Sequence, residues 1–390
     1  MSLDLLAPQE GSLDKVGDKT QLLGCFDPQV LTFIEALSNS LLTSNTAKYH
    51  PELVALGFWL RASNIKNMQK MKPSGLLKPL GWVVHFTPAN VDTMFIYSWI
   101  CSLLMGNHNV IRVATKTSAL KSCLLDILKQ LFARPEFTLL GQHNLFVHYD
   151  KHAHYSATLS LQADARVIWG GDESVNAIRQ LPCKPRNRDI SFADRYSAAL
   201  VAGESCTQSQ NVEQLADLFW RDTKPYNQQA CSSPKVIFWL GETRYLPDFL
   251  NALDNLASKQ ASSITHKNNQ LINLQLVKSH QQNSQTLLNN RICALAISSL
   301  DSQLMEWHAG ENVIYIRQID NLESLQNESS EKLQTLSYWG IDKDRLLKQI
   351  GSESILGIDR IVPLGQALDF EPIWDSYDLF SQLSRTIRFS

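Results

Sequence analysis

The sequence predicts an α/β protein with two domains, and three observations lead to that class. The chain has 390 residues, 44% of them hydrophobic and 19% charged, which is enough material for two packed cores. A strand–helix–strand pattern runs from Trp82 to Val113, and a second alternation of strands and helices follows Cys231. We therefore expect a Rossmann-like cofactor domain and a smaller α/β catalytic domain.

The first 75 residues are predicted to be an N-terminal helical segment that packs on the cofactor domain. Residues 1–20 are polar and expected to be loosely held. An amphipathic pattern over Val30–Leu37 predicts a covering helix, and a second helix over 51–64 begins with Pro51 in its first turn. Pro73 to Gly75 end this segment, so the core domain is expected to begin there.

The cofactor domain is expected to span residues 76–203. It begins with a strand over 82–86, an apolar helix over 94–105 and a strand over 109–113. A helix over 117–132 and a strand over 144–148 follow, and residues 189–201 are predicted to form one further strand. The polar turn that begins at Gly203 marks the expected domain boundary.

Polar side chains follow two strands of this domain. Asn90 stands after the first strand, and Arg112, Thr115 and Lys116 stand at the end of the second. Ligands of parallel sheets lie at the carboxyl ends of strands, so these residues are candidates for binding a cofactor or substrate. A turn asparagine and two solvated bases are the alternative interpretation.

Trp169, Gly170 and Gly171 end a strand and precede a helix. A glycine pair lets backbone approach a ligand, and the amides at a helix N-terminus favour phosphate. Plain turns contain the same pair, and the dinucleotide fingerprint G-x-G-x-x-G is absent from the sequence. The turn is therefore a candidate nucleotide site of another kind.

Cys231 lies in a polar loop before the continuously apolar stretch Val236–Leu240, which predicts a buried strand. A partly exposed loop permits the thiolate that nucleophilic chemistry needs, whereas most free cysteines are small buried hydrophobes. The catalytic domain is expected over residues 204–360. Its other predicted elements are helices over 245–256 and 269–290 and strands over 293–297, 312–316 and 357–365. A C-terminal segment, residues 361–390, is expected to pack back and to end in a helix.

Composition excludes several classes of function. A net charge of −2 gives no bulk attraction to nucleic acid or to an anionic membrane, so a small-molecule substrate is expected. The seven cysteines are scattered without a C-x-x-C pair or metal-ligand spacing, which indicates reduced thiols in the cytoplasm and no metal site. The sequence contains neither a signal peptide pattern nor an apolar run long enough to span a membrane.

Six short segments in order, with a longer one near the C-terminus, resemble the aldehyde dehydrogenase superfamily. They are Pro-Leu-Gly81, Thr-Pro-Ala-Asn90, Gly-Asn-His-Asn-Val-Ile-Arg112, Trp-Gly-Gly171, Phe-Ala-Asp-Arg-Tyr-Ser197, Asn-Gln-Gln-Ala-Cys231 and the stretch from Asp359 to Asp378. Within the superfamily the chain resembles the LuxC-type fatty acyl-CoA reductases known from bacterial luminescence. The resemblance covers roughly residues 50–390 and implies an aldehyde-dehydrogenase-like fold.

The resemblance also implies roles for the candidate residues. Cys231 matches the nucleophile and Asn90 the amide of the oxyanion hole, where a preorganised donor is worth about 3 kcal/mol. Arg112 matches a lysine that binds the adenosine ribose, and Thr115 stands where many NAD-preferring relatives have glutamate. With Lys116 nearby, the missing carboxylate favours a 2′-phosphate and hence NADPH as cofactor.

The remaining matched residues and the departures bear on the reaction. Trp169, Gly170 and Gly171 match the turn that covers the cofactor pyrophosphate. The superfamily's general-base glutamate has no counterpart, since Asp194 is the nearest acid, and a reductase has no need of the water which that base activates. The N-terminal region is shorter than in relatives, and Ser376 replaces a glycine.

The predicted function is NADPH-dependent reduction of a long-chain fatty acyl-CoA, or another acyl thioester, to the fatty aldehyde through an acyl-cysteine. Two alternatives are an NADP-linked aldehyde dehydrogenase and a non-catalytic partner subunit with the same fold. Expected partners are the acyl-CoA or acyl-protein substrate, an acyl-transferring protein and further copies of the chain in a homo-oligomer. A glutamate from elsewhere, such as Glu173, Glu204 or Glu371, poised over the Cys231 sulfur would favour the dehydrogenase.

Overall fold

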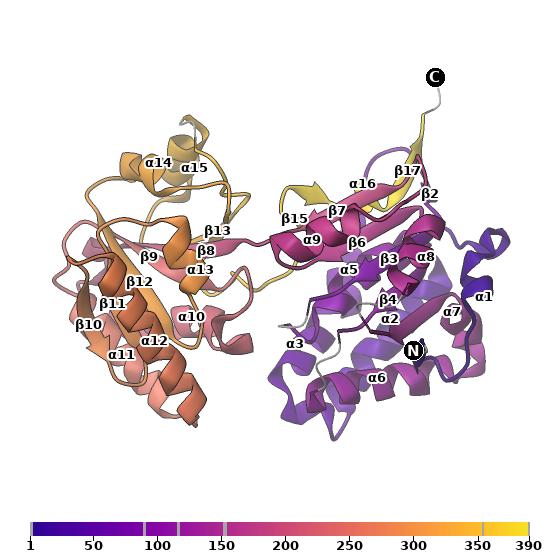
Figure 1. Cartoon of the computed structure of the whole chain (residues 1–390), viewed down its shortest axis with the longest axis horizontal. Coiled ribbons are helices and arrows are strands. Elements are labelled where there is room, and N and C mark those ends of the chain that lie inside the picture. The colour runs from indigo at the N-terminus through magenta and orange to yellow at the C-terminus, as the bar shows by residue number, and fades with distance from the viewer. Residues whose placement is uncertain (1–2, 89–90, 115–117, 151–153, 353–354, 389–390) are drawn as a thin grey trace. The chain divides into compact units, whose positions relative to one another are not determined.

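The computed structural model describes residues 3–88, 91–114, 118–150, 154–352 and 355–388. The chain forms two compact units (Figure 1). Unit 1 contains residues 1–194 and 370–390, and unit 2 contains residues 195–369. Each is an α/β unit built on its own, largely parallel sheet, as the sequence predicts.

Unit 1 is built on a six-stranded sheet in the order β1-β5-β4-β3-β6-β7. Its strands are β1 (Asp4–Ala7), β3 (Trp82–Phe86), β4 (His108–Arg112), β5 (Asn144–His148), β6 (Ala165–Trp169) and β7 (Arg188–Phe192). All neighbours pair in parallel except β1, which runs antiparallel to β5. Because β1 pairs with the sheet, the expectation that residues 1–20 are loosely held is wrong.

Helices cover both faces of this sheet (Figure 1). One face packs on α1 (Leu13–Gly17), α8 (Tyr155–Gln162) and α9 (Asp172–Arg179). On the other face His85 of β3 shares a hydrogen bond with Ser98 of α5 (Met94–Leu104). The further helices are α2 (Pro28–Thr43), α3 (Pro51–Trp59), α4 (Ala62–Lys70), α6 (Ala119–Phe132) and α7 (Thr138–Gln142).

The C-terminal residues return to unit 1. After β15 (Ile373–Trp374) and β16 (Tyr377–Asp378), the short α16 (Leu379–Gln382) leads into β17 (Ser384–Ile387). This strand pairs antiparallel with β2 (Leu76–Pro79). The expectation that a helix closes the chain is wrong, because β2 offers an unpaired edge that a last strand can satisfy.

Unit 2 is built on a seven-stranded sheet in the order β10-β11-β12-β9-β8-β13-β14. Its strands are β8 (Tyr196–Ala202), β9 (Pro234–Leu240), β10 (Gln285–Asn289), β11 (Cys293–Ala296), β12 (Val313–Ile319), β13 (Leu333–Trp339) and β14 (Arg360–Pro363). Only the edge strand β10 pairs antiparallel. The inner strands β8, β9, β12 and β13 are mostly buried on both faces, which explains their apolar runs, whereas the edge strands β10 and β14 are more exposed.

Two apolar layers enclose the sheet of unit 2. Residues such as Ile237 and Trp239 of β9 face α10 (Ser209–Thr223) and α11 (Leu246–Ser258), whereas Val236 and Phe238 face the opposite layer. That second layer includes α12 (Ile264–His280), α13 (Ser302–Trp307), α14 (Leu325–Glu328) and α15 (Lys343–Ser352). No helix in the described ranges has the length and apolarity that crossing a bilayer requires.

Two other element predictions need correction. Residues 189–201 form two strands, β7 and β8, which belong to different sheets and are separated at Ala193–Arg195. The structure consequently divides the chain at 194/195, one strand before the predicted boundary at Gly203. The predicted helix over 269–290 is α12 followed by β10, because the edge of β11 has free backbone groups that β10 pairs with.

Candidate active site

The loop that contains Cys231 connects α10 to β9 through an unusual backbone. Its 3₁₀ turn, Pro225–Gln228, holds three consecutive non-glycine residues at positive φ: Tyr226 (55°), Asn227 (52°) and Gln228 (63°). Each left-handed residue costs on the order of 1 kcal/mol or more, so the surroundings must hold this turn in place. Cys231 itself is partly exposed at the end of the loop.

Gln228 supplies part of that restraint. Its side chain is fully buried, and its Nε2 donates to the backbone oxygens of Pro234 (2.8 Å) and Val313 (2.9 Å). Pro234 begins β9 and Val313 begins β12, so one amide ties the loop to the first residues of two strands. The loop is therefore anchored to the sheet three residues before the nucleophile candidate.

A second left-handed turn supports the first. Gly310, Glu311 and Asn312 also have positive φ, and the Glu311 amide donates to the Asn227 oxygen at 2.8 Å. A Cβ at position 310 would lie 2.7 Å from that oxygen, which no side chain could tolerate. Gly310 is therefore required by the close approach of the two turns.

Ser197 connects Cys231 to the neighbouring strands. Its Oγ donates to the Cys231 oxygen (2.7 Å) and accepts from the Thr335 amide (3.3 Å). Ser197 lies near the start of β8 and Thr335 near the start of β13. The cysteine thus lies at the amino ends of β8, β9 and β13.

Gln334 contacts the cysteine sulfur directly. It is the second residue of β13, its side chain is 1% exposed, and its Nε2 donates to the Cys231 Sγ at 3.5 Å. Gln334 and Ser197 are functional candidates that reasoning from the sequence missed as individual residues. Ser197 is the last residue of the Phe-Ala-Asp-Arg-Tyr-Ser motif, whereas Gln334 is 103 positions from Cys231 and no local pattern marks it.

The structure bears on one of the alternative bases. Glu204 lies in the turn Gly203–Cys206, which follows the carboxyl end of β8, whereas Ser197 and the cysteine loop lie at its amino end. A strand of seven residues spans roughly 20 Å, so Glu204 is remote from the sulfur. Glu173, Glu371 and Asp194 belong to unit 1.

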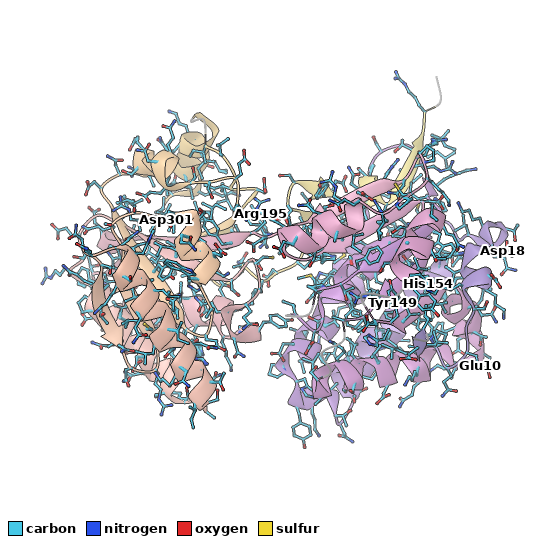
Figure 2. The ribbon with its side chains drawn as sticks, in the orientation of Figure 1. Glu10, Asp18, Tyr149, His154, Arg195 and Asp301 are labelled. Atoms are coloured by element: carbon cyan, nitrogen blue, oxygen red, sulfur yellow. The ribbon has the colours of Figure 1, made fainter. Side chains whose placement is uncertain are left out.

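In unit 1 the cofactor candidate Arg112 is the last residue of β4. Its guanidinium carbon lies 5.3 Å from the ring centre of Tyr149, which is a cation–π contact. Tyr149, labelled in Figure 2, directly follows β5, the strand that neighbours β4. Among the described residues the buried Nε of Arg112 has no hydrogen-bond partner. Arg112 therefore retains donor capacity that an anionic ligand could use.

Trp169 ends β6, and Gly170 and Gly171 lead into α9. The indole of Trp169 stacks on Phe192 with 3.8 Å between ring centres, and within the described ranges its buried Nε1 has no partner. The first turn of α9 contains Asp172 and Glu173, whose negative charges oppose phosphate binding at that helix end.

Asn90, Thr115 and Lys116 lie outside the described residues. The segments that flank them are joined by Lys121 of α6, a further residue that sequence reasoning missed. Its side chain is nearly buried, and its Nζ contacts the Asp92 carboxylate (3.2 Å) and the Ala114 oxygen (3.4 Å). One lysine thus links the chain after β3 to the chain after β4.

The comparisons with known proteins decide the family. The model of the family described as Acyl-CoA reductase (LuxC) matches residues 62–388. The chain belongs to the LuxC acyl-CoA reductase family. Membership in this family makes it an oxidoreductase of the acyl-CoA/aldehyde type. No curated protein matches the chain.

Solved structures share the fold of this LuxC-family protein. An NADP-dependent enzyme from E. coli matches with a TM-score of 0.71 at 9% identity, over 95% of this chain and 88% of that one. An NAD-dependent aldehyde dehydrogenase from Sinorhizobium meliloti matches with 0.65 at 13%, over 95% and 79%. Lactaldehyde dehydrogenase from Escherichia coli matches with 0.66 at 11%, over 92% and 86%. The predicted aldehyde-dehydrogenase-like fold is confirmed.

Proposed function

We propose that the protein reduces a long-chain fatty acyl-CoA to the fatty aldehyde with NADPH, through an acyl thioester on Cys231. The observation that supports this most is the family match over residues 62–388, which includes Cys231 in its partly exposed loop. A partly exposed cysteine held by a constrained loop suits nucleophilic chemistry.

The proposed role of Cys231 has three steps. The thiolate attacks the thioester carbonyl, the C–S bond to CoA breaks, and CoA leaves as a thiol after taking up a proton. Reduction of the acyl carbonyl then leaves a thiohemiacetal on the same sulfur. When its C–S bond breaks, the aldehyde is released and the electron pair returns to Cys231.

A nicotinamide cofactor bound to unit 1 would supply the hydride. Arg112 fits a phosphate-bearing ribose, because its guanidinium stands at a strand's carboxyl end with an unpartnered Nε among the described groups. The acidic first turn of α9 does not fit a pyrophosphate at the helix end. We therefore propose that the turn of Trp169, Gly170 and Gly171 lets its backbone lie close to the cofactor. Thr115 and Lys116 remain proposed contacts, as does Asn90 for the oxyanion.

The alternative, an NADP-linked aldehyde dehydrogenase, needs a base that activates water at the acyl-cysteine. Such a base acts within roughly 3 Å or through one water and gains about 10² to 10⁴ in rate. Glu204 lies at the far end of β8, and the general-base glutamate of the superfamily pattern has no counterpart in Phe192–Ser197, where the nearest acid is the shorter Asp194. These observations favour the reductase.

Labelled acyl-CoA tests the proposal when NADPH is withheld. We expect a hydroxylamine-sensitive label on the peptide that contains Cys231, no label in Cys231→Ala, and full labelling in the control Cys183→Ala, which removes an exposed thiol of unit 1. Adding NADPH should discharge the label to aldehyde much faster than buffer discharges it to acid. Rapid release of fatty acid without NADPH would instead establish the hydrolytic dehydrogenase, and turnover by Cys231→Ala would refute the nucleophile.

A further inference from the structure

A bulge in β13 turns Gln334 toward the nucleophile. In the register of β13 against β8, Gln334 and Thr335 together face the single residue Ser197, so β13 carries one extra residue there. β9 carries a second irregularity against β8 at the same level, beside Ser197. Bulges occur next to active sites, where they redirect a side chain. The register shifts of β13 and β9 against β8 therefore both lie beside Ser197, the residue that bonds the Cys231 oxygen.

We propose that Gln334 is a further catalytic residue, whose side-chain amide donates a hydrogen bond to the Cys231 sulfur and stabilises its anionic form. This inference rests on the proposed function, since it assigns Gln334 a part in the same acyl transfer and reduction. The contact is between Nε2 and Sγ, at 3.5 Å, from a side chain that is 1% exposed. A buried amide has little conformational freedom to lose when it makes this bond.

The donor acts twice in the reaction cycle. Before attack it favours the thiolate over the thiol, because a hydrogen bond to a charged acceptor is stronger than one to a neutral acceptor. When the thiohemiacetal breaks down, the alkoxide electron pair reforms the carbonyl, the C–S bond breaks and its electron pair returns to sulfur. Gln334 then stabilises the leaving thiolate, which speeds aldehyde release.

The same bond also lowers the intrinsic nucleophilicity of the sulfur, since nucleophilicity falls with thiol pKa. Removing the donor should therefore change the acylation rate in a direction that depends on pH, which the loss of a merely structural glutamine would not do. At high pH, where the thiol is ionised without help, the variant should acylate as fast as the natural protein or faster. At neutral pH it should acylate more slowly.

Gln334→Met removes the donor at similar size, and the test measures alkylation of Cys231 by iodoacetamide as a function of pH. Mass spectrometry of the peptide that contains Cys231 separates it from the other six cysteines. We expect the apparent pKa of Cys231 to rise by about one unit, as loss of one charge-assisted bond would cause. Gln334→Glu, which sets a carboxylate beside the sulfur, should raise it further.

The matched control is Gln281→Met. Gln281 is also a buried amide of unit 2, but its Nε2 donates to the Ser299 oxygen (2.8 Å), so this variant should leave the Cys231 profile unchanged. Unchanged profiles in folded Gln334→Met and Gln334→Glu would overturn the inference. Because alkylation requires no acyl-CoA or NADPH, failure of the proposed reaction would appear separately, as absence of acyl label on a thiol whose pH profile still depends on Gln334.

Discussion

The two parallel sheets present their candidate functional groups at opposite ends. In unit 1 the groups follow the carboxyl ends of strands: Arg112 closes β4 and Trp169 closes β6. In unit 2 they stand at the amino ends, where Ser197, Cys231 and Gln334 meet at the starts of β8, β9 and β13. The rule that ligands bind at carboxyl ends therefore locates the candidates of unit 1 and would misplace those of unit 2.

The two sites also differ in how their side chains are held. Arg112 and Trp169 rest on aromatic rings, and each keeps a buried nitrogen that has no partner among the described residues. In unit 2 the backbone of the cysteine loop is constrained by two left-handed turns and by Gln228. Unit 1 thus has N–H groups that can donate hydrogen bonds to a ligand, whereas unit 2 holds one sulfur in place.

The largest effect should come from removing the constraint in unit 2. Gln228→Leu loses both hydrogen bonds to the strands and leaves the Pro234 and Val313 oxygens buried, which should cost about 1–3 kcal/mol of unfolding free energy. Displacing the sulfur by about 1 Å should lower acyl-CoA reduction by about 10²-fold. Steady-state kinetics and urea unfolding measure the two effects.

Gln281→Leu is the control for this variant, because it also removes a buried amide from unit 2. The side chain of Gln281 bonds to Ser298 and Ser299 and not to the strands that hold the cysteine loop. Gln281→Leu should lose comparable stability and keep its turnover. If Gln228→Leu retained full activity, or if both variants lost activity equally, the cysteine loop would not depend on Gln228 and the contrast between the units would fail.

The sequence predicts the sheet of unit 1 well and the detail of unit 2 less well. The 82–86 and 144–148 strands and the Cys231 loop follow from local patterns of apolar and turn residues. The break at Asp194 is not visible, because Ile190 of β7 and Val201 of β8 belong to two strands joined by only three residues, with no glycine or proline between them. Long-range pairing, not local preference, assigns them to different sheets.

The contact between Gln334 and Cys231 could not be predicted from sequence. It depends on an extra residue in β13, and a bulge is set by pairing with β8 rather than by composition. The sequence does not predict β1 and β17 for a related reason, since each is a short strand that depends on pairing with an edge elsewhere in unit 1. Gly310 similarly has meaning only where its turn meets Asn227.

A smaller effect should come from unit 1, where Arg112 is proposed to bind the cofactor's 2′-phosphate. One charge-assisted contact is worth roughly 1.4 kcal/mol, or about tenfold in preference for NADPH over NADH. Arg112→Gln should therefore lower the ratio of kcat/KM for the two cofactors about tenfold. Arg179→Gln, which removes an exposed arginine of α9, is the matched control. Equal use of NADPH and NADH by the natural protein would contradict the proposal.

The smallest effects concern how the stability of each unit depends on pH, where the two units are expected to respond in opposite directions. In unit 1 His143 stacks on His108 with ring centres 3.9 Å apart, and both are buried. Burial, and after it the His108 charge, lowers the pKa of His143 to about 4 from its usual 6.5. The unfolded chain thus takes up a proton that the folded one refuses, so stability that is present above pH 6.5 is lost as pH falls toward 4.

In unit 2 the pKa of Asp222 is shifted in the opposite direction, so its contribution to stability changes the other way with pH. Asp222 lies near the end of α10, 1% exposed, and accepts from the amides of Gly365 (2.7 Å) and Ala367 (3.0 Å). Burial outweighs these bonds and raises the pKa of Asp222 to about 7 from 3.8. The folded state therefore holds the proton more tightly, and the stability it contributes below pH 3.8 is lost as pH rises through 7.

Hydrogen exchange measured by mass spectrometry between pH 5 and 7.5, corrected for the intrinsic exchange rate, separates the two contributions. Acidification should lower the free energy of local opening of β4 and β5 around the histidine pair. It should raise that free energy for residues 364–367 around Asp222, each change being on the order of 1 kcal/mol. His143→Phe should reduce the first trend and leave the second. Asp222→Asn, which keeps a carbonyl acceptor without a charge, should abolish the second and leave the first. Trends of the same sign in both regions, or trends that persist in these variants, would mean that neither group governs the pH response of its unit.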